Sequence, residues 1–387
     1  YKNVSGWNEF QRITADRDFT INKKLFRSLN DSNNKTVLIR ARAGESWTVK
    51  DCPDWISVSP SSGTGKTEVV ISVAEMSDAD VVTVNYEAMD TGGNYQNYSF
   101  EGRRHELVFA LDGKDATTSI VVEQYDYEYG DGDVITVQEA TIGEGVNVVF
   151  MGDCFDAKDI SEGKYLEGIN EAIGYYFDIE PYKTYKEYFN VYTVVGLSPD
   201  SGVGTVNTIR ESRFGTQYTL NAGLAPREDL CFEAACLAPI NDDVSRTLIV
   251  MIENSEDYGG VSYMWGDGSA ISLCSMSRDL YPYDFRGLIQ HEAGGHGFGK
   301  LGAEYIYHNA FISSCSCPCC PHVYEFNIYK AYGWFDNLSL DGNIHGVPWA
   351  HLFFDEQFQN TVDIYEGGYM HTRGVFRSEP NSCMNNN

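Results

Sequence analysis

Long hydrophobic runs are missing from this sequence of 387 residues. No apolar stretch approaches the roughly 18–20 residues that cross a bilayer, so no segment is expected to span a membrane. Basic residues are also scarce, with 28 Lys and Arg against 56 Asp and Glu and a formal net charge of −28. The electrostatic field of such a negative chain repels phosphate backbones, which argues against nucleic-acid binding.

Cysteine is too sparse for a disulfide-stapled scaffold, since only ten cysteines are spread over the chain. Cys315, Cys317, Cys319 and Cys320 nevertheless form a tight cluster. The cluster lacks the two C-x-x-C pairs of a zinc knuckle, so we interpret it as disulfides or loop thiols and leave it out of the chemistry.

What the chain does contain is ordinary for globular protein, with 42% hydrophobic and 22% charged residues. At about 100–200 residues per domain, this length suits two domains. Aromatic residues make up 13% of the chain, a usage that favours strands over helical bundles.

Short alternating segments fill residues 35–124, among them TVLIRA, WISVSP and TSIVVEQY, with turn residues between them. This pattern predicts a small all-β sandwich. The stretch DWISVSPSSGTGKTEVVISVAE, with Trp55 and its SPSSGTG turn, resembles the BACON-type sandwich domain of exported bacterial enzymes. The resemblance implies glycan contact by this domain, and the alternative is a simple spacer.

The pattern changes after the Gly- and Asp-rich segment 125–145, which is the natural domain boundary. Residues 146–155 and 247–254 have the unbroken apolar runs of buried strands, and helical spacing predicts a helix over 161–177. Strands alternating with helices indicate an α/β layer, so the expected fold class is α+β multidomain. The expected divisions are a β-sandwich at 1–125, a linker at 126–143 and a second, catalytic domain at 144–387.

The segment HEAGGHGFGKLGAEY carries the chemistry of the chain. A hydrolytic zinc site needs two imidazole ligands from one helix face and a carboxylate beside the metal-bound water, and this segment offers two histidines and a glutamate. His291 and His296 are five residues apart, not the usual four, and would diverge by about 140° on an ideal α-helix. We predict that a π-type bulge at Gly294–Gly295 brings them together, within a helix capped by Asp284.

Glu292 is the expected general base, which takes a proton from the attacking water and passes it to the leaving amine. The identity of the third zinc ligand stays open at this point. Glu304 is the nearest carboxylate after the histidines and is our candidate, with His308 and His322 as alternatives.

LGAEY (301–305), together with YEGGYMHTRGVFRSEPNSCMNN (365–386), resembles the bacterial IgA-peptidase family of zinc endopeptidases. VVFMGDCF and YGGVSYMW extend the likeness over most of residues 144–387. The resemblance implies a metzincin-like domain, a Zn²⁺ ion and protein or peptide substrates, with immunoglobulin A as the substrate of some members. The family pattern L-x-D-E-Y has an acid where this chain has Ala303.

The ending NSCMNN is similar to the Met-containing turn beneath the zinc of metzincins, which makes Met384 a candidate floor residue. Tyr305 is a candidate for a core, substrate-pocket or transition-state role. An edge strand near 259–276 is expected to pair with an extended peptide by β-augmentation.

The expected function is therefore that of a secreted or cell-surface zinc metallopeptidase. The alternatives are a catalytically degenerate adhesin or glycan-binding protein with a peptidase fold, and a redox or metal-storage protein built on the cysteine cluster. Export is expected from the sandwich type, the acidic surface and the peptidase class, and the chain opens at Tyr1 as a mature form would.

Overall fold

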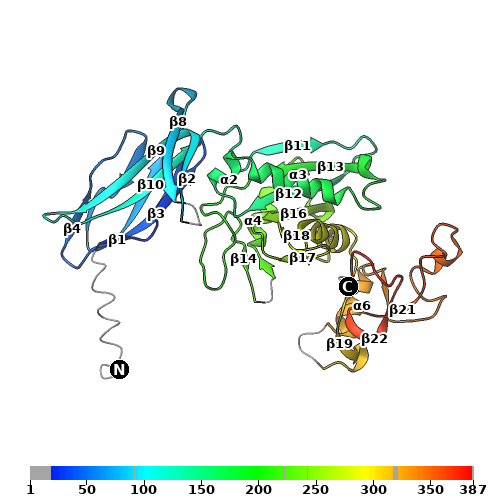
Figure 1. The fold of residues 1–387 in the computed structure, drawn as a ribbon. Coiled ribbons are helices and arrows are strands. Elements are labelled where there is room, and N and C mark those ends of the chain that lie inside the picture. Colours follow the sequence, from blue (N-terminus) through cyan, green and yellow to red (C-terminus); the bar gives the residue numbers. More distant parts are fainter. Residues whose placement is uncertain (1–18, 90–92, 221–222, 242, 317–320, 386–387) are drawn as a thin grey trace, which may run out of the picture. The chain divides into compact units, whose positions relative to one another are not determined.

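The computed structural model describes residues 19–89, 93–220, 223–241, 243–316 and 321–385. Three members of the cysteine cluster, Cys317, Cys319 and Cys320, lie outside these ranges. The chain divides into two compact units, Tyr1–Gly130 with Asp156–Gly163, and Asp131–Phe155 with Lys164–Asn387 (Figure 1). In the described ranges, no helix is both long enough and apolar enough to cross a membrane.

Two β-sheets make up the first unit, with strand orders β1-β3-β7-β5 and β2-β10-β9-β4-β6, and β8 beside β9. The first unit also contains the short helices η1 (Asp78–Asp80) and α2 (Ala157–Ser161). The strands are β1 Thr20–Ile21, β2 Leu25–Ser28, β3 Asn33–Arg40, β4 Ser46–Val49, β5 Ile56–Ser59, β6 Ser62–Thr64, β7 Lys66–Val73, β8 Val82–Met89, β9 Tyr95–Leu111 and β10 Thr117–Tyr125.

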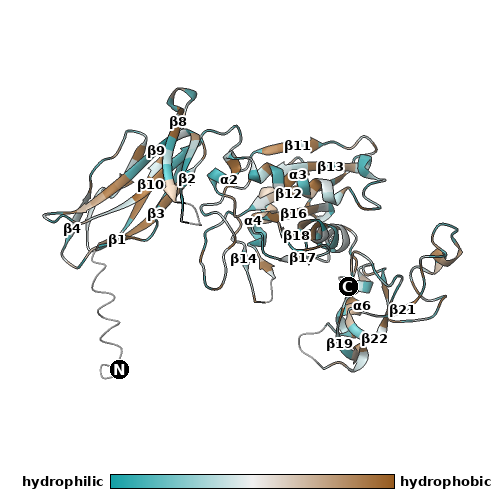
Figure 2. Ribbon diagram, in the orientation of Figure 1, coloured by the Kyte–Doolittle hydropathy of each residue, from teal (hydrophilic) through white to brown (hydrophobic). Residues whose placement is uncertain are grey.

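Both sheets of the first unit contribute to a single hydrophobic core. Val37 and Ile39 of β3 alternate with exposed or half-buried residues, and their inward faces meet Phe109 of β9 and Trp47 of β4 in that core. The Trp47 and Phe109 rings lie edge to face at 5.7 Å. Figure 2 shows brown hydrophobic stretches along β3 and β9. The N-terminal unit is therefore all-β, as its alternating sequence indicates.

A six-stranded sheet, in the order β11-β13-β12-β16-β18-β17, forms the centre of the second unit. Its four inner strands run parallel, and the two edge strands β11 and β17 are antiparallel to their neighbours. The strands are β11 Val134–Gln138, β12 Val146–Asp153, β13 Phe189–Val194, β16 Thr247–Glu253, β17 Gly260–Met264 and β18 Ala270–Ser275.

The buried strands predicted from apolar runs are confirmed as β12 and β16, and every residue of β16 is buried. The expected linker 126–143 is wrong in part, because Val134–Gln138 pairs with β13. That pairing joins residues far apart in sequence. The Gly and Asp residues around β11 favour a loop, so the local sequence does not predict the strand.

Helices cover both faces of this sheet. Residues of α4 (Glu228–Ala235) belong to the apolar core on one face, while α3 (Lys164–Tyr176) and η4 (Ile289–Phe298) pack on the other. The predicted helix 161–177 is confirmed over most of its length, but Ser161 ends α2 and does not open α3. Gly163, at φ +89°, separates the two helices.

A smaller sheet, β19-β22-β20 with β21 beside β22, follows the active-site segment in the same unit. Its first strand begins directly after Tyr305, whose carbonyl accepts a hydrogen bond from the Met370 backbone N–H. The elements of this region are β19 Ile306–Phe311, η5 Ile312–Ser314, α6 Val323–Ala331, β20 Leu338–Ser339, η6 Ala350–Phe354, β21 Tyr365–Gly368 and β22 Met370–Arg377. The remaining short elements of the second unit are η2 Lys186–Tyr188, β14 Gln217–Tyr218, β15 Leu224–Ala225, η3 Val244–Arg246 and α5 Phe285–Leu288.

Candidate active site

The helix that carries the HEAGGH segment is a π-helix over Ile289–Phe298, which continues from α5 (Phe285–Leu288). The Asp284 carboxylate caps α5 by accepting a hydrogen bond from the Gly287 N–H at 2.8 Å, as the sequence predicts. The predicted distortion is confirmed and is longer than a one-residue bulge. In a π-helix residue i bonds to residue i+5, so side chains five apart lie one above the other.

The His291 and His296 rings therefore face one another, with centroids 4.8 Å apart and planes at 82°. Each Nδ1 lies 2.7 Å from a backbone carbonyl oxygen, that of Cys383 for His291 and that of Leu301 for His296. Because a carbonyl only accepts, each Nδ1 must carry its hydrogen and donate it. Both Nε2 atoms are then left with free lone pairs, which is the state a metal ligand requires.

Burial keeps both imidazoles neutral. It lowers the pKa of His291, and it lowers the pKa of His296 to about 3 with help from the neighbouring His291. Neutral rings are available to a cation at pH 7 without first losing a proton.

The two glycines of the motif are each matched by a neighbouring side chain. A Cβ on Gly295 would lie 1.9 Å from Sδ of Met384, which is itself buried. The Tyr182 hydroxyl donates a hydrogen bond to the Gly294 carbonyl oxygen. Met384 therefore packs against the helix between the two histidines, and no larger residue fits at position 295 without displacing it.

Glu292 is buried beside the edge strand β17. A Cβ on Gly260 would lie 3.0 Å from Oε1 of Glu292, so only glycine lets the strand pass this close. Burial raises the pKa of Glu292 to about 8, and the Ser262 hydroxyl opposes the shift. Within the described ranges, Oε2 of Glu292 has no hydrogen-bond partner. A buried carboxylate oxygen of this kind calls for a proton, a water or a cation.

Tyr305 lies beside His291. Its ring stacks on that of His291, with centroids 6.0 Å apart and planes at 20°. Burial, and then the charge of Glu292, raises the pKa of the Tyr305 phenol, so it remains a hydrogen-bond donor throughout the neutral range.

Glu304 is buried, and both of its oxygens are in use. Oε1 accepts from the Asn337 amide at 2.9 Å, and Oε2 accepts from the Ser382 hydroxyl at 2.7 Å. Burial raises its pKa, against the effect of these two donors. Ala303 is also buried and offers only a methyl group.

The structure does not gather Glu304, His308 or His322 with the two histidines into a three-ligand group. His308 lies on β19. His322 lies at the start of α6, where its backbone N–H donates a hydrogen bond to the Glu325 carboxylate. The sequence analysis missed His371, which is fully buried opposite His308 on β22. Its Nδ1 bonds to the Tyr369 carbonyl, and its Nε2 has no partner among the residues described.

Among the described residues, three ligand-type side chains lie close together at the carboxyl ends of β12 and β16, namely Asp153, Cys154 and Glu253. The two Asp153 oxygens accept hydrogen bonds from five donors, so this carboxylate is already engaged by the protein. Burial, and then the charge of Asp153, raises the pKa of Glu253 well above its ordinary value. The Asp153 carboxylate thus holds the loops that follow β12 and β13 through its hydrogen bonds. The five donors are Cys154 N, Ser198 Oγ, Phe214 N, Ser212 Oγ and Thr216 N.

The sequence model of the family described as IgA Peptidase M64 matches residues 135–334, slightly more than half of the chain. The chain belongs to the IgA peptidase M64 family. The matched span includes the π-helix with His291, Glu292 and His296. The description of the M64 family names a peptidase activity, and the matched span of this chain carries the paired histidines.

Similarity between this M64 chain and solved structures is weak. A Bacteroides ovatus GH5 xyloglucanase in complex with a XXXG heptasaccharide is 14% identical with a TM-score of 0.21, over 59% of this chain and 44% of that one. The Vibrio cholerae VesB protease is 10% identical with a TM-score of 0.17, over 31% of this chain and 35% of that one. The chain thus spans less than half of either structure. No curated protein matches the sequence.

Proposed function

We propose that the chain is a zinc-dependent endopeptidase with a metzincin-like catalytic domain. The observation that carries the proposal is the pair of facing imidazoles with free Nε2 lone pairs, beside a buried Glu292 oxygen that lacks a partner. Imidazole nitrogens with carbonyl-held Nδ1 hydrogens suit Zn²⁺. When bound, the ion supplies Lewis-acid activation of a water and of the scissile carbonyl.

Glu292 accepts a proton from the attacking water and delivers it to the leaving amine. Its buried position and raised pKa suit a group that must both take and return a proton. Tyr305, stacked on His291 and kept protonated, is placed to donate a hydrogen bond to the substrate carbonyl oxygen as charge develops there.

Glu304 is our proposal for the third ligand, because it follows the helix directly and its backbone N–H is held by the Met384 carbonyl. Binding of the ion by Glu304 would exchange one of its hydrogen bonds, to Asn337 or to Ser382, for the metal. The test is zinc affinity. Glu304→Ala should lower it by more than the roughly 10–100-fold that loss of an outer-shell partner costs, with His308→Ala and His371→Ala as matched comparisons. Loss of zinc in His371→Ala but not in Glu304→Ala would reassign the ligand.

The edge strand β17 is the proposed substrate-binding strand. The Trp265 N–H bonds to Ser269, and the Ser275 N–H bonds to Gly259. These two bonds fix the antiparallel register with β18, in which alternate residues bond to the partner strand. The other residues of β17 direct their backbone N–H and C=O groups away from β18, where they are free to pair with an extended peptide. These residues are Gly260, Ser262 and Met264.

We also propose that the first unit is a BACON-like sandwich that presents the enzyme outside the cell. The support is its pair of sheets around one core and the exposed acidic character of the chain. Immunoglobulin or another host glycoprotein is the proposed substrate, by analogy with the family description.

The decisive experiment uses the full chain loaded with zinc, and measures hydrolysis of unstructured protein substrates. Glu292→Gln should lower turnover by about 10²–10⁴-fold, because general base catalysis has that magnitude. Zinc content should stay at the wild-type level, and a chelator should abolish the wild-type activity. Unchanged hydrolysis in Glu292→Gln would remove Glu292 from the mechanism. Bound zinc with no hydrolysis of any substrate would favour a degenerate, binding-only protein.

A further inference from the structure

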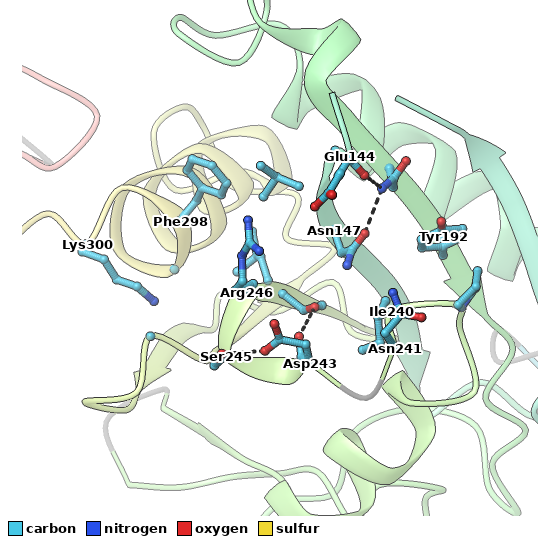
Figure 3. A pocket seen from close by; sticks show the side chains of 18 residues that line it. Glu144, Asn147, Tyr192, Ile240, Asn241, Asp243, Ser245, Arg246, Phe298 and Lys300 are labelled. Carbon is cyan, nitrogen blue, oxygen red and sulfur yellow. Dashed lines mark hydrogen bonds between the residues drawn. The ribbon is translucent and has the colours of Figure 1, made fainter. Parts of the chain in front are cut away.

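A hollow of about 550 Å³ lies at the amino-terminal ends of the parallel strands, away from the proposed zinc ligands (Figure 3). Its walls come from the first residues of β12, β13 and β16, from the η3 turn and from the end of η4. His291, Glu292 and His296 do not line it. The hollow is therefore separate from the peptidase chemistry.

Two cationic side chains line this hollow without a carboxylate partner. In the part of the chain that the structure describes, no carboxylate oxygen lies within 4.0 Å of the Arg246 guanidinium or the Lys300 ammonium. Figure 3 shows Arg246 between Phe298 and Asn147, with Lys300 directed inward from the end of η4. Four arginines of this unit pair with an Asp or Glu, namely Arg213, Arg227, Arg278 and Arg286, whereas Arg210 and Arg377, like Arg246, have no such pair among the described residues. The charge of Asp267 acts on Lys300, and the Glu144 and Asp243 carboxylates line the same hollow, so the attraction of an anion rests on Arg246.

Fixed polar groups line the opposite wall. The Asn190 amide donates to the Glu144 carbonyl and to Oδ1 of Asn147, both at 3.0 Å, and its own oxygen accepts from the Ala140 N–H at 2.8 Å. Asn147 is thereby oriented, with its amide nitrogen left as a donor. The Asp243 carboxylate, held by the Ser245 hydroxyl at 2.6 Å, offers an acceptor on the floor. Donors and acceptors at fixed places suit a ligand with hydroxyl groups.

An apolar hollow of about 220 Å³ adjoins this one, and the two share Val146 and Phe298. Tyrosines line it, and Tyr185 and Tyr188 keep 53% and 41% of their surface exposed. The C–H face of a pyranose ring packs on exposed aromatic faces by dispersion, while its hydroxyls remain free to bond elsewhere. An aromatic surface, fixed hydrogen-bonding groups and an anion site thus lie side by side.

We propose that the hollow binds an acidic sugar, a pyranose that carries a carboxylate. The carboxylate lies on Arg246, whose planar fork binds it in bidentate fashion, with Lys300 beside it. The ring packs near Phe298, and the hydroxyls meet Asn147 and Asp243. This site does not depend on the proposed zinc chemistry.

The experiment is calorimetric titration of the full chain with the methyl glycoside of glucuronic acid at low salt. We expect saturable binding that Arg246→Ala weakens at least about tenfold, the effect of losing one charged hydrogen-bonding pair. Arg246→Lys should recover only part of the affinity, because it loses the bidentate geometry. Arg278→Ala, which removes an arginine of the same unit that pairs with Glu256 at 2.6 Å, is the matched control and should bind as the wild type does. Circular dichroism checks that each variant is folded.

Several results would overturn the proposal. Equal binding of the neutral methyl glucoside would remove the role of the charge, and equal binding of acetate or sulfate would leave an anion site with no sugar specificity. Tighter binding of a short peptide through its terminal carboxylate would reassign the ligand to a peptide. Absence of binding by every probe, or wild-type affinity in Arg246→Ala, would discard the site. Because the titration needs neither zinc nor turnover, its failure is distinguishable from failure of the peptidase proposal.

Discussion

Two hydrogen atoms decide what the histidine pair can do. The Cys383 and Leu301 carbonyls hold the Nδ1 hydrogens of His291 and His296, so both lone pairs are presented on the other side of the rings. A side-chain carboxylate in place of either carbonyl would have favoured the charged imidazolium. Backbone acceptors fix the tautomer while burial keeps the rings neutral.

Gly295 gives a test of the packing beneath these rings. Gly295→Ala should lower the free energy of unfolding by about 1–3 kcal/mol, because its methyl group would overlap Met384. In a double-mutant cycle with Met384→Ala, most of that cost should vanish. Gly174→Ala on the exposed face of α3 is the matched control, since nothing lies within 4 Å of the added carbon. That change should stabilise the protein by about 0.5–1 kcal/mol. Additive effects of the two core substitutions in urea unfolding would contradict the assignment.

Glu253 gives a pH test far from the histidines. Its folded-state pKa lies well above the ordinary 4.5, so its protonation stabilises the fold fully below the ordinary pKa. That stabilisation is lost as the pH rises through the folded-state pKa. Glu253→Gln cannot lose a proton, so its stability relative to the wild type should increase steadily from about pH 5 upward. Urea unfolding of both proteins across the pH range measures this. A difference that is the same at every pH would show that Glu253 does not carry the buried proton.

At the scale of elements, the active-site helix is the part that the sequence predicted best. Histidines five residues apart would diverge on an α-helix, so the motif predicted a π-type bulge, and the structure has a longer π-helix at this place. The buried strands β12 and β16 followed from their apolar runs for a similarly local reason.

The missed features depend on contacts between distant segments. Strand β11 exists because β13, more than fifty residues later, supplies its hydrogen bonds. The surroundings of Glu304 follow from a turn at Lys300, with φ +52°, and from Asn337 and Ser382, which no local pattern connects to it. Spacing alone therefore proposes His291 and His296 as ligands but does not assign a third one.

The edge strand β17 gives a prediction about substrate pairing. Met264→Pro removes an N–H that points away from β18, so the sheet should tolerate it. Loss of one hydrogen bond to the peptide, at about 0.5–1.5 kcal/mol, should raise the KM for peptides by roughly 2–10-fold with little change in kcat. Tyr263→Pro, whose N–H bonds to β18, is the comparison and should lower the melting temperature instead. Unchanged KM in a folded Met264→Pro variant would place the substrate elsewhere.

At the scale of the whole molecule, the excess of acidic residues should cost stability through self-repulsion. Raising NaCl from about 10 to 200 mM should therefore raise the melting temperature at pH 7, by about 2–4 °C for each kcal/mol of repulsion relieved. Calorimetry measures this shift. Near pH 4.5, the isoelectric point, the net charge vanishes and the same salt should have little effect. A melting temperature that falls with salt at pH 7 would show that specific ion pairs outweigh the net repulsion.

The carbonyl that orients His291 belongs to a residue 92 positions further along the chain. A growing polypeptide therefore carries its histidines before the residues that orient them, and the two rings are aligned only after Cys383 and Met384 have been synthesised and have docked. The order of synthesis thus delays alignment of the pair until the fold around it is assembled.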